Sequence, residues 1–270
     1  MGAREKAAFI RQSDLPGVEI LKVENCTRLF SVFHTAYEVC TVLPRPVVSE
    51  WMYRGKIHVA GSRGTSFMEP GESHHNLSMQ GVGDFRVFFF APELMQRWSE
   101  EHDGPRTPHF CAVQTYDAGV YRTFNRFHAS LRGPASCLER QSLLADCLGL
   151  LMQTCVEANR PGAEPRRERE AVRRAKEVIR ERFREAVPLE DLSRAAGLSR
   201  FHLARAFKKE TGLSPHAFQT QLRIARAREL LKTRIPIVEI AQEVGFYDQS
   251  HFTHYFKRAW GVTPAEYARG

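Results

Sequence analysis

The sequence lacks the features that several common classes of protein require. Its longest strongly apolar run, Val87 to Ala91, is far shorter than the roughly 18 residues of a membrane-spanning helix. Its first residues, MGAREKAAFIRQ, are charged where a signal peptide has an apolar centre. No P-loop, G-x-S-x-G or H-E-x-x-H motif occurs. These absences predict a soluble, cytoplasmic protein and exclude the enzyme classes that depend on those motifs.

Cysteine is scarce and unpaired in the sequence. None of the six cysteines forms a C-x-x-C motif, and all of them precede residue 156. Because paired spacing is typical of zinc sites and redox centres, its absence predicts reduced and mostly buried thiols.

Positive charge is concentrated in the second part of the chain. Up to Pro165 there are about 17 Lys and Arg against about 18 Asp and Glu, whereas from Arg166 onward there are about 22 against 13. A basic region joined to a neutral one predicts that the basic region meets a polyanion. A basic surface that is merely well solvated is the alternative that charge alone leaves open.

The neutral region shows strand periodicity followed by helical periodicity. From Thr27 to about Val113, short alternating segments rich in β-branched and aromatic residues are separated by Gly and Pro, which predicts a β-barrel or jelly roll. Two apolar helical stripes follow, and they pack either on the barrel or on a second copy of the chain. Their members are Val120, Phe124, Phe127 and Leu131, and then Leu143, Leu144, Cys147, Leu148, Leu151 and Met152.

Composition divides the chain into two domains. Residues 158–167 combine two prolines, a glycine and dense charge, which is typical of an exposed linker. We therefore expect one domain over residues 1–157 and a second, entirely helical one over residues 168–270.

A unit of about 49 residues occurs twice in the basic domain. Gly197, Gly212 and Pro215 in the first copy align with Gly245, Gly261 and Pro264 in the second. Each copy reads as a helix, a turn containing glycine and a second helix, which is the arrangement of a helix-turn-helix DNA reader. Ser214-Pro215 opens a connecting helix of about 18 residues, roughly 27 Å long, so that one chain can reach two successive major grooves.

The second helix of each copy, near residues 200–209 and 249–258, has an outward face that is polar and basic. Helical geometry places Arg205 and Lys208 on this face in the first copy, and Ser250, His254 and Lys257 in the second. Neither face carries a carboxylate, whereas a helix exposed only to solvent usually mixes both signs. Ser199 and Asp248 precede the two helices and are expected to cap them.

The repeated unit resembles the DNA-binding domain of AraC/XylS-type transcriptional regulators. The first motif of that family, S-x-x-x-L-x-R-x-F-K-x-x-x-G-x-(S/T)-P, is met from Ser199 to Pro215, and the second, which begins G-F-x-(D/S)-x-S-x-F, is met from Gly245 to Pro264. The resemblance implies base-reading roles for Phe201, His202, Ala204, Arg205, Gln249, Ser250, Thr253 and His254. It implies phosphate contacts from Lys208, Lys209, His251, Lys257 and Arg258.

The first domain resembles, less specifically, the cupin-like barrel that binds an effector in the same family. The segments His34–Glu38 and Met68–His75 carry this resemblance. It implies an effector site formed by His34, Tyr37, Glu38, Trp51, Tyr53, His58 and His74, with dimerisation through the helices that follow. Cupin enzymes bind a metal through three histidines and a glutamate. Three of these ligands could be supplied by His34, Glu38 and either His74 or His75, but Val32 stands where the motif has its first histidine. We therefore predict no metal and no cofactor.

The predicted fold is α+β: an N-terminal cupin-like β-barrel with C-terminal helices, then an all-α domain of two helix-turn-helix units joined by a long helix. The resemblance implies a DNA-binding transcriptional regulator, an activator rather than a repressor, that is not an enzyme. Its implied partners are double-stranded DNA, a small-molecule effector, a second copy of the chain and RNA polymerase. The alternative is a cupin-type metalloenzyme fused to a DNA-binding tail.

Overall fold

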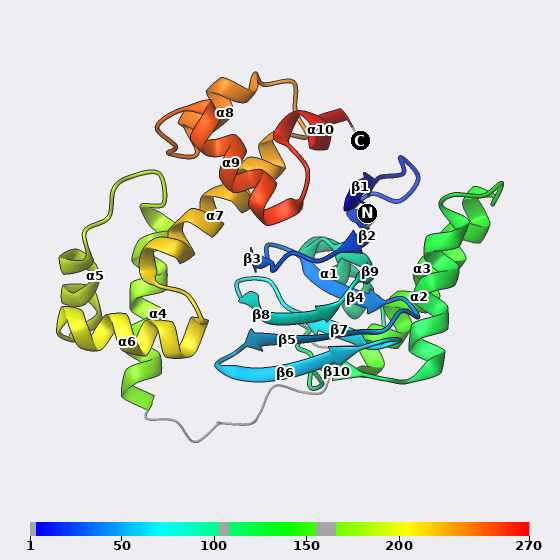
Figure 1. Ribbon diagram of the computed structural model, residues 1–270, viewed down its shortest axis with the longest axis horizontal. Coiled ribbons are helices and arrows are strands. Elements are labelled where there is room, and N and C mark those ends of the chain that lie inside the picture. Colours follow the sequence, from blue (N-terminus) through cyan, green and yellow to red (C-terminus); the bar gives the residue numbers. More distant parts are fainter. Residues whose placement is uncertain (1–3, 103–107, 155–165, 270) are drawn as a thin grey trace.

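The computed structural model describes residues 4–102, 108–154 and 166–269. A β domain and a helical domain lie side by side, and the second of these wraps along one edge of the first (Figure 1). The predicted linker, residues 158–167, lies outside the described residues except for its last two, with which helix α4 begins.

The β domain consists of two antiparallel sheets. The larger sheet has the strand order β1-β2-β9-β4-β7-β10, and the smaller has the order β3-β8-β5-β6. The strands are β1 (Lys6–Ile10), β2 (Val18–Cys26), β3 (Ser31–Phe33), β4 (Tyr37–Val42), β5 (Val47–Tyr53), β6 (Lys56–Gly61), β7 (Thr65–Met68), β8 (Ser73–Gly81), β9 (Gly83–Phe90) and β10 (Gln114–Thr115).

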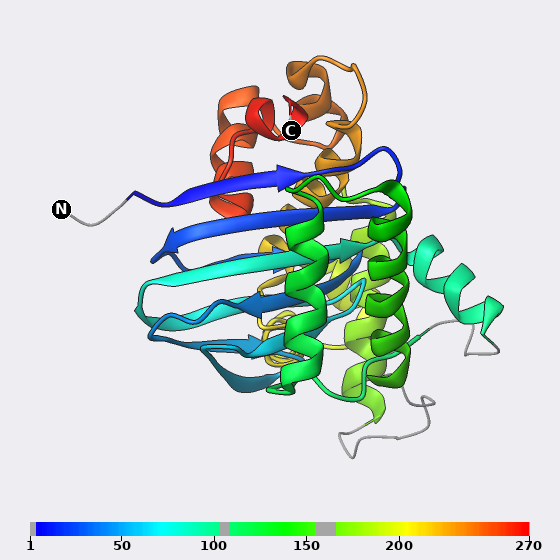
Figure 2. The same ribbon diagram turned by 90° about the vertical axis from the view of Figure 1, so that its right-hand side faces the viewer.

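Residue alternation gives the larger sheet two apolar faces. Along β9, Phe85, Val87 and Phe89 point between the sheets, whereas Phe88 and Phe90 point outward. Helices α2 (Ala118–Ser130) and α3 (Cys137–Thr154) cover the outward face, as Figure 2 shows. The sequence left open whether the apolar stripes of these helices pack on the barrel or on a second copy of the chain. In the structure they pack on the barrel. A further helix, α1 (Pro92–Glu101), follows β9.

The helical domain contains the predicted pair of helix-turn-helix units. The first unit is α5 (Leu189–Ala196) and α6 (Arg200–Thr211), and the second is α8 (Ile237–Glu243) and α9 (Gln249–Trp260). Helix α7 (Pro215–Leu230) joins them, α4 (Arg166–Glu181) precedes them, and α10 (Pro264–Arg269) ends the domain. The aligned glycines of both copies have positive φ, so the repeat in the sequence is a repeat in the backbone.

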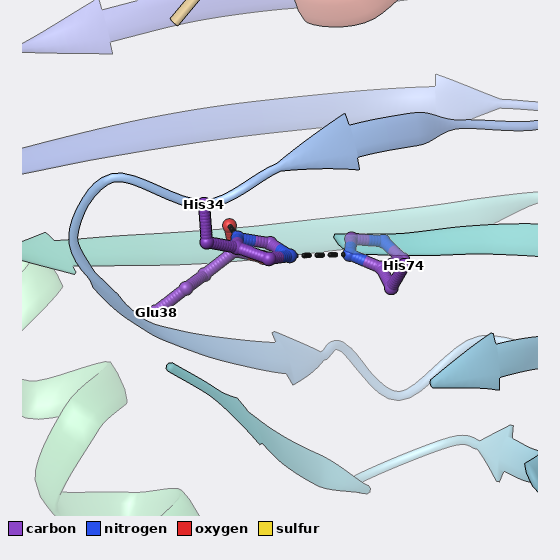
Figure 3. A group of neighbouring side chains, drawn as sticks. All are labelled: His34, Glu38 and His74. Atoms are coloured by element: carbon purple, nitrogen blue, oxygen red, sulfur yellow. Dashed lines mark hydrogen bonds and ion pairs between the residues drawn. The ribbon is translucent and has the colours of Figure 1, made fainter. Parts of the chain in front are cut away.

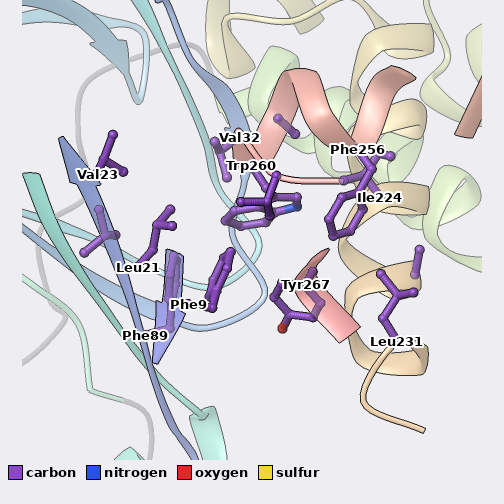
Figure 4. Close-up of a cluster of buried hydrophobic side chains, with 14 of the residues drawn as sticks. Phe9, Leu21, Val23, Val32, Phe89, Ile224, Leu231, Phe256, Trp260 and Tyr267 are labelled. Atoms are coloured by element: carbon purple, nitrogen blue, oxygen red, sulfur yellow. The ribbon is translucent and has the colours of Figure 1, made fainter. Parts of the chain in front are cut away.

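The two domains share one hydrophobic core. Phe9, Leu21 and Phe89 of the barrel pack with Phe256 and Trp260 of α9 in a single buried cluster (Figure 4). The Trp260 ring lies 5.7 Å from that of Phe89 and 6.1 Å from that of Phe9, both in edge-on contacts. Because this cluster is continuous, the second helix-turn-helix unit is packed against the barrel rather than tethered beside it.

A buried ion pair crosses the same boundary. Arg228 on α7 donates to the Glu19 carboxylate on β2 at 2.5 Å and to the Tyr267 hydroxyl at 3.1 Å. Arg11 and Lys232 reach the same carboxylate at 2.6 and 3.4 Å. Burial opposes ionisation of Glu19, but the charges of Arg228 and Lys232 outweigh it and lower its pKa to about 2.

The thiols are less uniformly buried than the sequence indicated. Cys26 and Cys147 are buried and Cys40 is partly so, whereas Cys111 and Cys137 are exposed; all five are free thiols. Cys155 lies outside the described residues.

Among the helices of the described chain, none is long and apolar enough to cross a bilayer.

Gly245 is required by the turn of the second unit. Its φ is +88°, and a Cβ there would lie 2.4 Å from the carbonyl oxygen of Arg184. We expect Gly245→Ala to lower the free energy of unfolding by more than about 3 kcal/mol, since the αL cost and a backbone clash add. Gly197→Ala is the matched control: φ is +67° but no atom lies within 4 Å of its Cβ position, so the cost is about 1 kcal/mol. Urea unfolding measures both, and equal losses would contradict the clash.

Glu19 makes the stability of the chain depend on pH. Its pKa is about 2 in the folded chain against the usual 4.5. Its contribution is therefore complete above pH 4.5 and is lost as the pH falls toward 2. Glu19→Gln removes about 3 kcal/mol at neutral pH, because Arg228 is then buried without its counter-ion. The difference in urea stability between the two proteins should shrink from pH 5 to pH 3.

The control for this change lies on strand β5. Glu50→Gln removes an exposed carboxylate that accepts a hydrogen bond from the Ser78 hydroxyl, and it should cost less than about 1 kcal/mol. A loss from Glu19→Gln that did not vary with pH would show that the pKa of Glu19 is not lowered by folding.

Candidate nucleic-acid interface and effector cavity

Helices α6 and α9, called here the reading helices, expose the faces predicted from the sequence. On α6, Phe201 is 85% exposed and Arg205 and Lys208 are exposed, whereas Leu203 and Phe207 are buried in the first unit's core. Two of the predicted base readers, His202 and Ala204, are half-buried. The helix thus presents a narrow outward strip with an apolar inner face.

The outward strip of α9 is similar. Gln249, Ser250 and His254 are exposed and Thr253 is half-buried, while Phe252 and Phe256 are buried. The predicted phosphate contacts Lys208, Lys209, Lys257 and Arg258 lie in the last turns of the two helices and are exposed. Each reading helix therefore has its base-reading candidates in its first two turns and two predicted phosphate-binding cations in its last turn.

Both reading helices begin at the predicted caps. The Ser199 hydroxyl accepts from the backbone N–H of His202 at 3.3 Å, and the Asp248 carboxylate accepts from that of His251 at 2.7 Å. The His251 ring is exposed but packs against Phe246 and Tyr255 at centroid distances of 5.4 and 4.9 Å. This packing fixes the position of His251, which was predicted as a phosphate contact.

Two residues near the reading helices were missed by the sequence analysis. Tyr247, just before the Asp248 cap, is 91% exposed, and an aromatic side chain in the turn that leads into a reading helix was the available signal. Glu168 on α4 contacts His202, with 2.8 Å between its carboxylate and the ring Nε2. The hydrogen bond from His202 lowers the pKa of Glu168. The face of α6 carries no acid of its own, yet α4 supplies one beside it.

The barrel holds the C-terminal ends of both reading helices. Arg28 donates to the carbonyls of Arg258 at 2.8 Å and Lys257 at 3.4 Å, at the negative end of the α9 dipole. The Ser73 hydroxyl donates to the carbonyl of Thr211 at 2.8 Å, at the end of α6. The N-terminal ends, with which helix-turn-helix proteins contact base edges, point away from these contacts.

A cavity of about 90 Å³ lies between the two sheets and the end of α9. Its wall is mostly apolar, with a few polar side chains from β4, β5, β7 and β8. The lining residues are Leu21, Val23, Phe30, Val32, Glu38, Cys40, Val42, Ser49, Trp51, Ala60, Ser66, Met68, His74, Asn76, Met79, Phe85, Val87, Phe89, Ala259 and Trp260.

Three of the seven predicted effector residues line this cavity: Glu38, Trp51 and His74. His34 is buried and is not among the lining residues, but it contacts two of them, Glu38 and His74.

Tyr37, Tyr53 and His58 are not among the lining residues. Tyr37 precedes Glu38 on β4, so alternation sends its side chain to the outward face, where its hydroxyl donates to the Pro108 carbonyl at 2.8 Å. The side chain of Tyr53 lies at the end of strand β5. Its hydroxyl accepts a hydrogen bond from the backbone N–H of Glu69 there. His58 packs beside Trp51, with 5.0 Å between the rings.

His34, Glu38 and His74 form a hydrogen-bonded row. The Nδ1 of His34 lies 2.9 Å from the Glu38 carboxylate, and its Nε2 lies 2.8 Å from Nδ1 of His74 (Figure 3). Burial and the neighbouring His34 lower the pKa of His74 to about 3, so this imidazole stays neutral. Burial disfavours the charged form of Glu38, but His34 outweighs it and lowers the pKa of Glu38.

This row does not fit the metal site of a cupin enzyme. The three ligand atoms lie within 4.8 Å of one another, but both ring nitrogens of His34 are engaged by its two neighbours. A shared metal needs each ligand to direct a free lone pair at one common point. The first histidine of the cupin motif is also replaced, since Val32 occupies its position and lines the cavity wall.

Sequence comparison identifies the helical domain. Residues 192–270 match the model of a family described as "Helix-turn-helix domain". The HTH-type transcriptional activator RhaS of Escherichia fergusonii is 36% identical over 93 residues, which are 34% of each chain. The uncharacterized HTH-type transcriptional regulator YbfI of Bacillus subtilis is 28% identical over 169 residues. That match spans 62% of this chain and 61% of YbfI, so the chain covers less than two thirds of either relative.

Structure comparison extends to the whole chain. A variant of ToxT from Vibrio cholerae, in its apo form, superposes with a TM-score of 0.54 over 93% of this chain and 96% of that one, at 11% identity. At this identity the likeness establishes the fold, in which an N-terminal two-sheet domain precedes two helix-turn-helix units. Residues 192–270 therefore form a helix-turn-helix domain that is similar to those of HTH-type transcriptional regulators.

Proposed function

We propose that the protein is a one-component transcriptional regulator that binds double-stranded DNA through α6 and α9 and an effector in the barrel. The observation that carries the proposal is the pair of exposed, acid-free reading faces on two capped helices of a basic domain. A regulator also needs the reading helices to respond to the effector, and contacts between the barrel and the ends of both helices provide a route.

Helix α7 sets the span between the two reading helices. Its 16 residues correspond to about 24 Å of helix, and the two reading helices attach beyond its ends. This length supports simultaneous contact with two major grooves, whose centres lie about 34 Å apart on one face of B-DNA.

The roles of individual side chains follow from their chemistry. Arg205 suits a bidentate contact with guanine and Gln249 suits adenine, while Ala204 offers only an apolar contact such as a thymine methyl. The cations Lys208, Lys209, Lys257 and Arg258 suit phosphate oxygens, which position a protein without specifying sequence.

The partners of such a regulator are part of the proposal. Cytoplasmic location, activation through RNA polymerase and homodimerisation follow the resemblance to AraC/XylS-type regulators. Because the apolar stripes of α2 and α3 are covered by the sheet, a dimer would use the outer side of these helices, where Leu138 is 74% exposed. The names of the relatives and the unsuitable geometry of the His34 row favour a regulator over the cupin metalloenzyme.

Selection from a random library of 30-base-pair duplexes with the full chain tests the proposed function. We expect enrichment of a bipartite motif whose halves are about one helical turn apart, 10–10.5 base pairs between centres. A single contiguous motif would mean that only one helix reads DNA, and no enrichment at low salt would overturn the proposal.

Arg205 and Lys257 should respond differently to truncation. Arg205→Ala is expected to cost about 1–3 kcal/mol at the selected site and to relax the choice at one base pair. Lys257→Ala should weaken selected and random DNA alike and lower the salt slope by about one unit. Fluorescence anisotropy with both duplexes at several salt concentrations measures these effects, with Arg122→Ala on α2 as the control. An unchanged specificity ratio in Arg205→Ala would contradict the base-reading role.

Glu168 should restrain DNA binding. Its carboxylate faces the phosphate-binding side of α6 beside His202, so Glu168→Gln is expected to raise the affinity for all duplexes by about threefold at low salt. Glu177→Gln on the same helix is the control, since Glu177 pairs with Arg173 instead. An affinity gain of the same size in the control would show a general charge effect.

A further inference from the structure

The cavity between the sheets is completed by the second reading helix. Ala259 and Trp260, the last residues of α9 before its C-cap, belong to its wall. In the first unit the equivalent positions are Glu210 and Thr211, so an apolar pair in the second copy replaces a polar pair in the first. Trp260 is only 3% exposed, and its apolar surface is buried against the barrel rather than against its own unit alone.

The polar part of the wall defines the chemistry of an occupant. Glu38 is the one carboxylate among the described lining residues, and these include no lysine or arginine. An anionic group would enter this wall without a cation and beside a buried carboxylate, which is costly. Among the described residues, the Glu38 carboxylate is hydrogen-bonded to His34. It can accept a further hydrogen bond from a group of the bound molecule that donates one. The indole N–H of Trp51 has no partner among the described residues, and it can donate to the oxygen of an alcohol, whereas a protonated amine has no lone pair to accept it.

The size of the cavity limits what fits without movement. A cavity of about 150 Å³ accommodates benzene, so about 90 Å³ suits a molecule of roughly four non-hydrogen atoms. The sheet strands are fixed by their ladders of backbone hydrogen bonds, whereas α9 contributes two side chains from another domain. A longer molecule therefore presses on Trp260 before it spreads the strands.

We propose that this cavity binds a small molecule with a short apolar body and a single alcohol or amine end, with that end at Glu38 and Trp51 and the body against Trp260. Molecules longer than the cavity displace the end of α9 and thereby change the affinity of the second reading helix for DNA. This inference rests on the proposed function, whose effector site it specifies, but binding at the cavity is tested without DNA and can therefore fail separately.

The three tryptophans of the chain allow a direct test of binding in the absence of DNA. The full chain is labelled with 5-fluorotryptophan and titrated with 1-propylamine, 1-propanol and butyrate, which share a propyl chain as their apolar body. We expect the fluorine resonances of Trp51 and Trp260 to shift with the amine or the alcohol, while that of Trp98 on α1 does not move. Butyrate should bind at least about tenfold more weakly. Equal binding of butyrate would overturn the assigned polar end, and shifts at Trp98 alone would overturn the site.

Glu38→Gln tests the head group independently of the tryptophans. The amide keeps the size of Glu38 and loses its charge, so the preference for propylamine over butyrate should fall to about threefold or less. An unchanged preference for the amine over butyrate in a folded Glu38→Gln variant would overturn the role of Glu38. If the variant unfolds, the preference measured with the unaltered chain still tests the head group.

Chain length tests the coupling to α9. Each amine is added until the fluorine shifts of the tryptophans no longer change. At that concentration hexylamine should change the affinity for the selected duplex by about threefold or more, whereas propylamine should leave it unchanged. Trp260→Ala enlarges the cavity and should abolish this dependence on length while amine binding persists. If amines bind but no length alters DNA affinity, the coupling is wrong and the site stands. If the chain binds no specific duplex, the proposed function fails and the fluorine shifts still decide the site.

Discussion

Arg228 is the residue on which the arrangement of the two domains depends. Its guanidinium is 3% exposed and lies against the rings of Phe89 and Trp260, at 4.2 and 4.6 Å, while its hydrogen bonds go to Glu19 and Tyr267. A charge at this depth is tolerated only with a counter-ion, and Glu19 is on a barrel strand. The ion pair therefore specifies one position of α7 on the barrel, and α7 carries a helix-turn-helix unit at each end.

This position brings the same part of both reading helices to the barrel, but with different chemistry. At α6 the contact is polar, from Ser73 to the Thr211 carbonyl. At α9 it is largely apolar, through Trp260, with Arg28 on the terminal carbonyls. An apolar contact adapts to shape more readily than a directional hydrogen bond does, so the two units differ in how they can respond to the contents of the barrel.

Much of the fold and of the exposed faces of α6 and α9 could be predicted from the sequence because both depend on local patterns. Strand alternation, the two helix caps and the aligned glycines each involve residues within a few positions of one another, and the structure has all of them. The effector cavity depends on contacts between distant segments, so it was predicted less well. Tyr37 and Glu38 were assigned to one wall although neighbours on a strand face opposite sides. Trp260 was assigned no role, and Glu168 lies on a helix outside the repeated unit. The sequence did hold a signal for Trp260, since the two copies differ in polarity at that position.

The shared core also has a consequence for how the helical domain behaves on its own. Ile224, Phe256 and Trp260 are buried in part by barrel residues such as Phe9 and Phe89. A fragment that begins at α4 would leave this apolar surface open to water, next to an Arg228 that has lost its counter-ion. Such a fragment would tend to self-associate, so the barrel serves the second reading unit as a permanent, covalently attached solubilising partner.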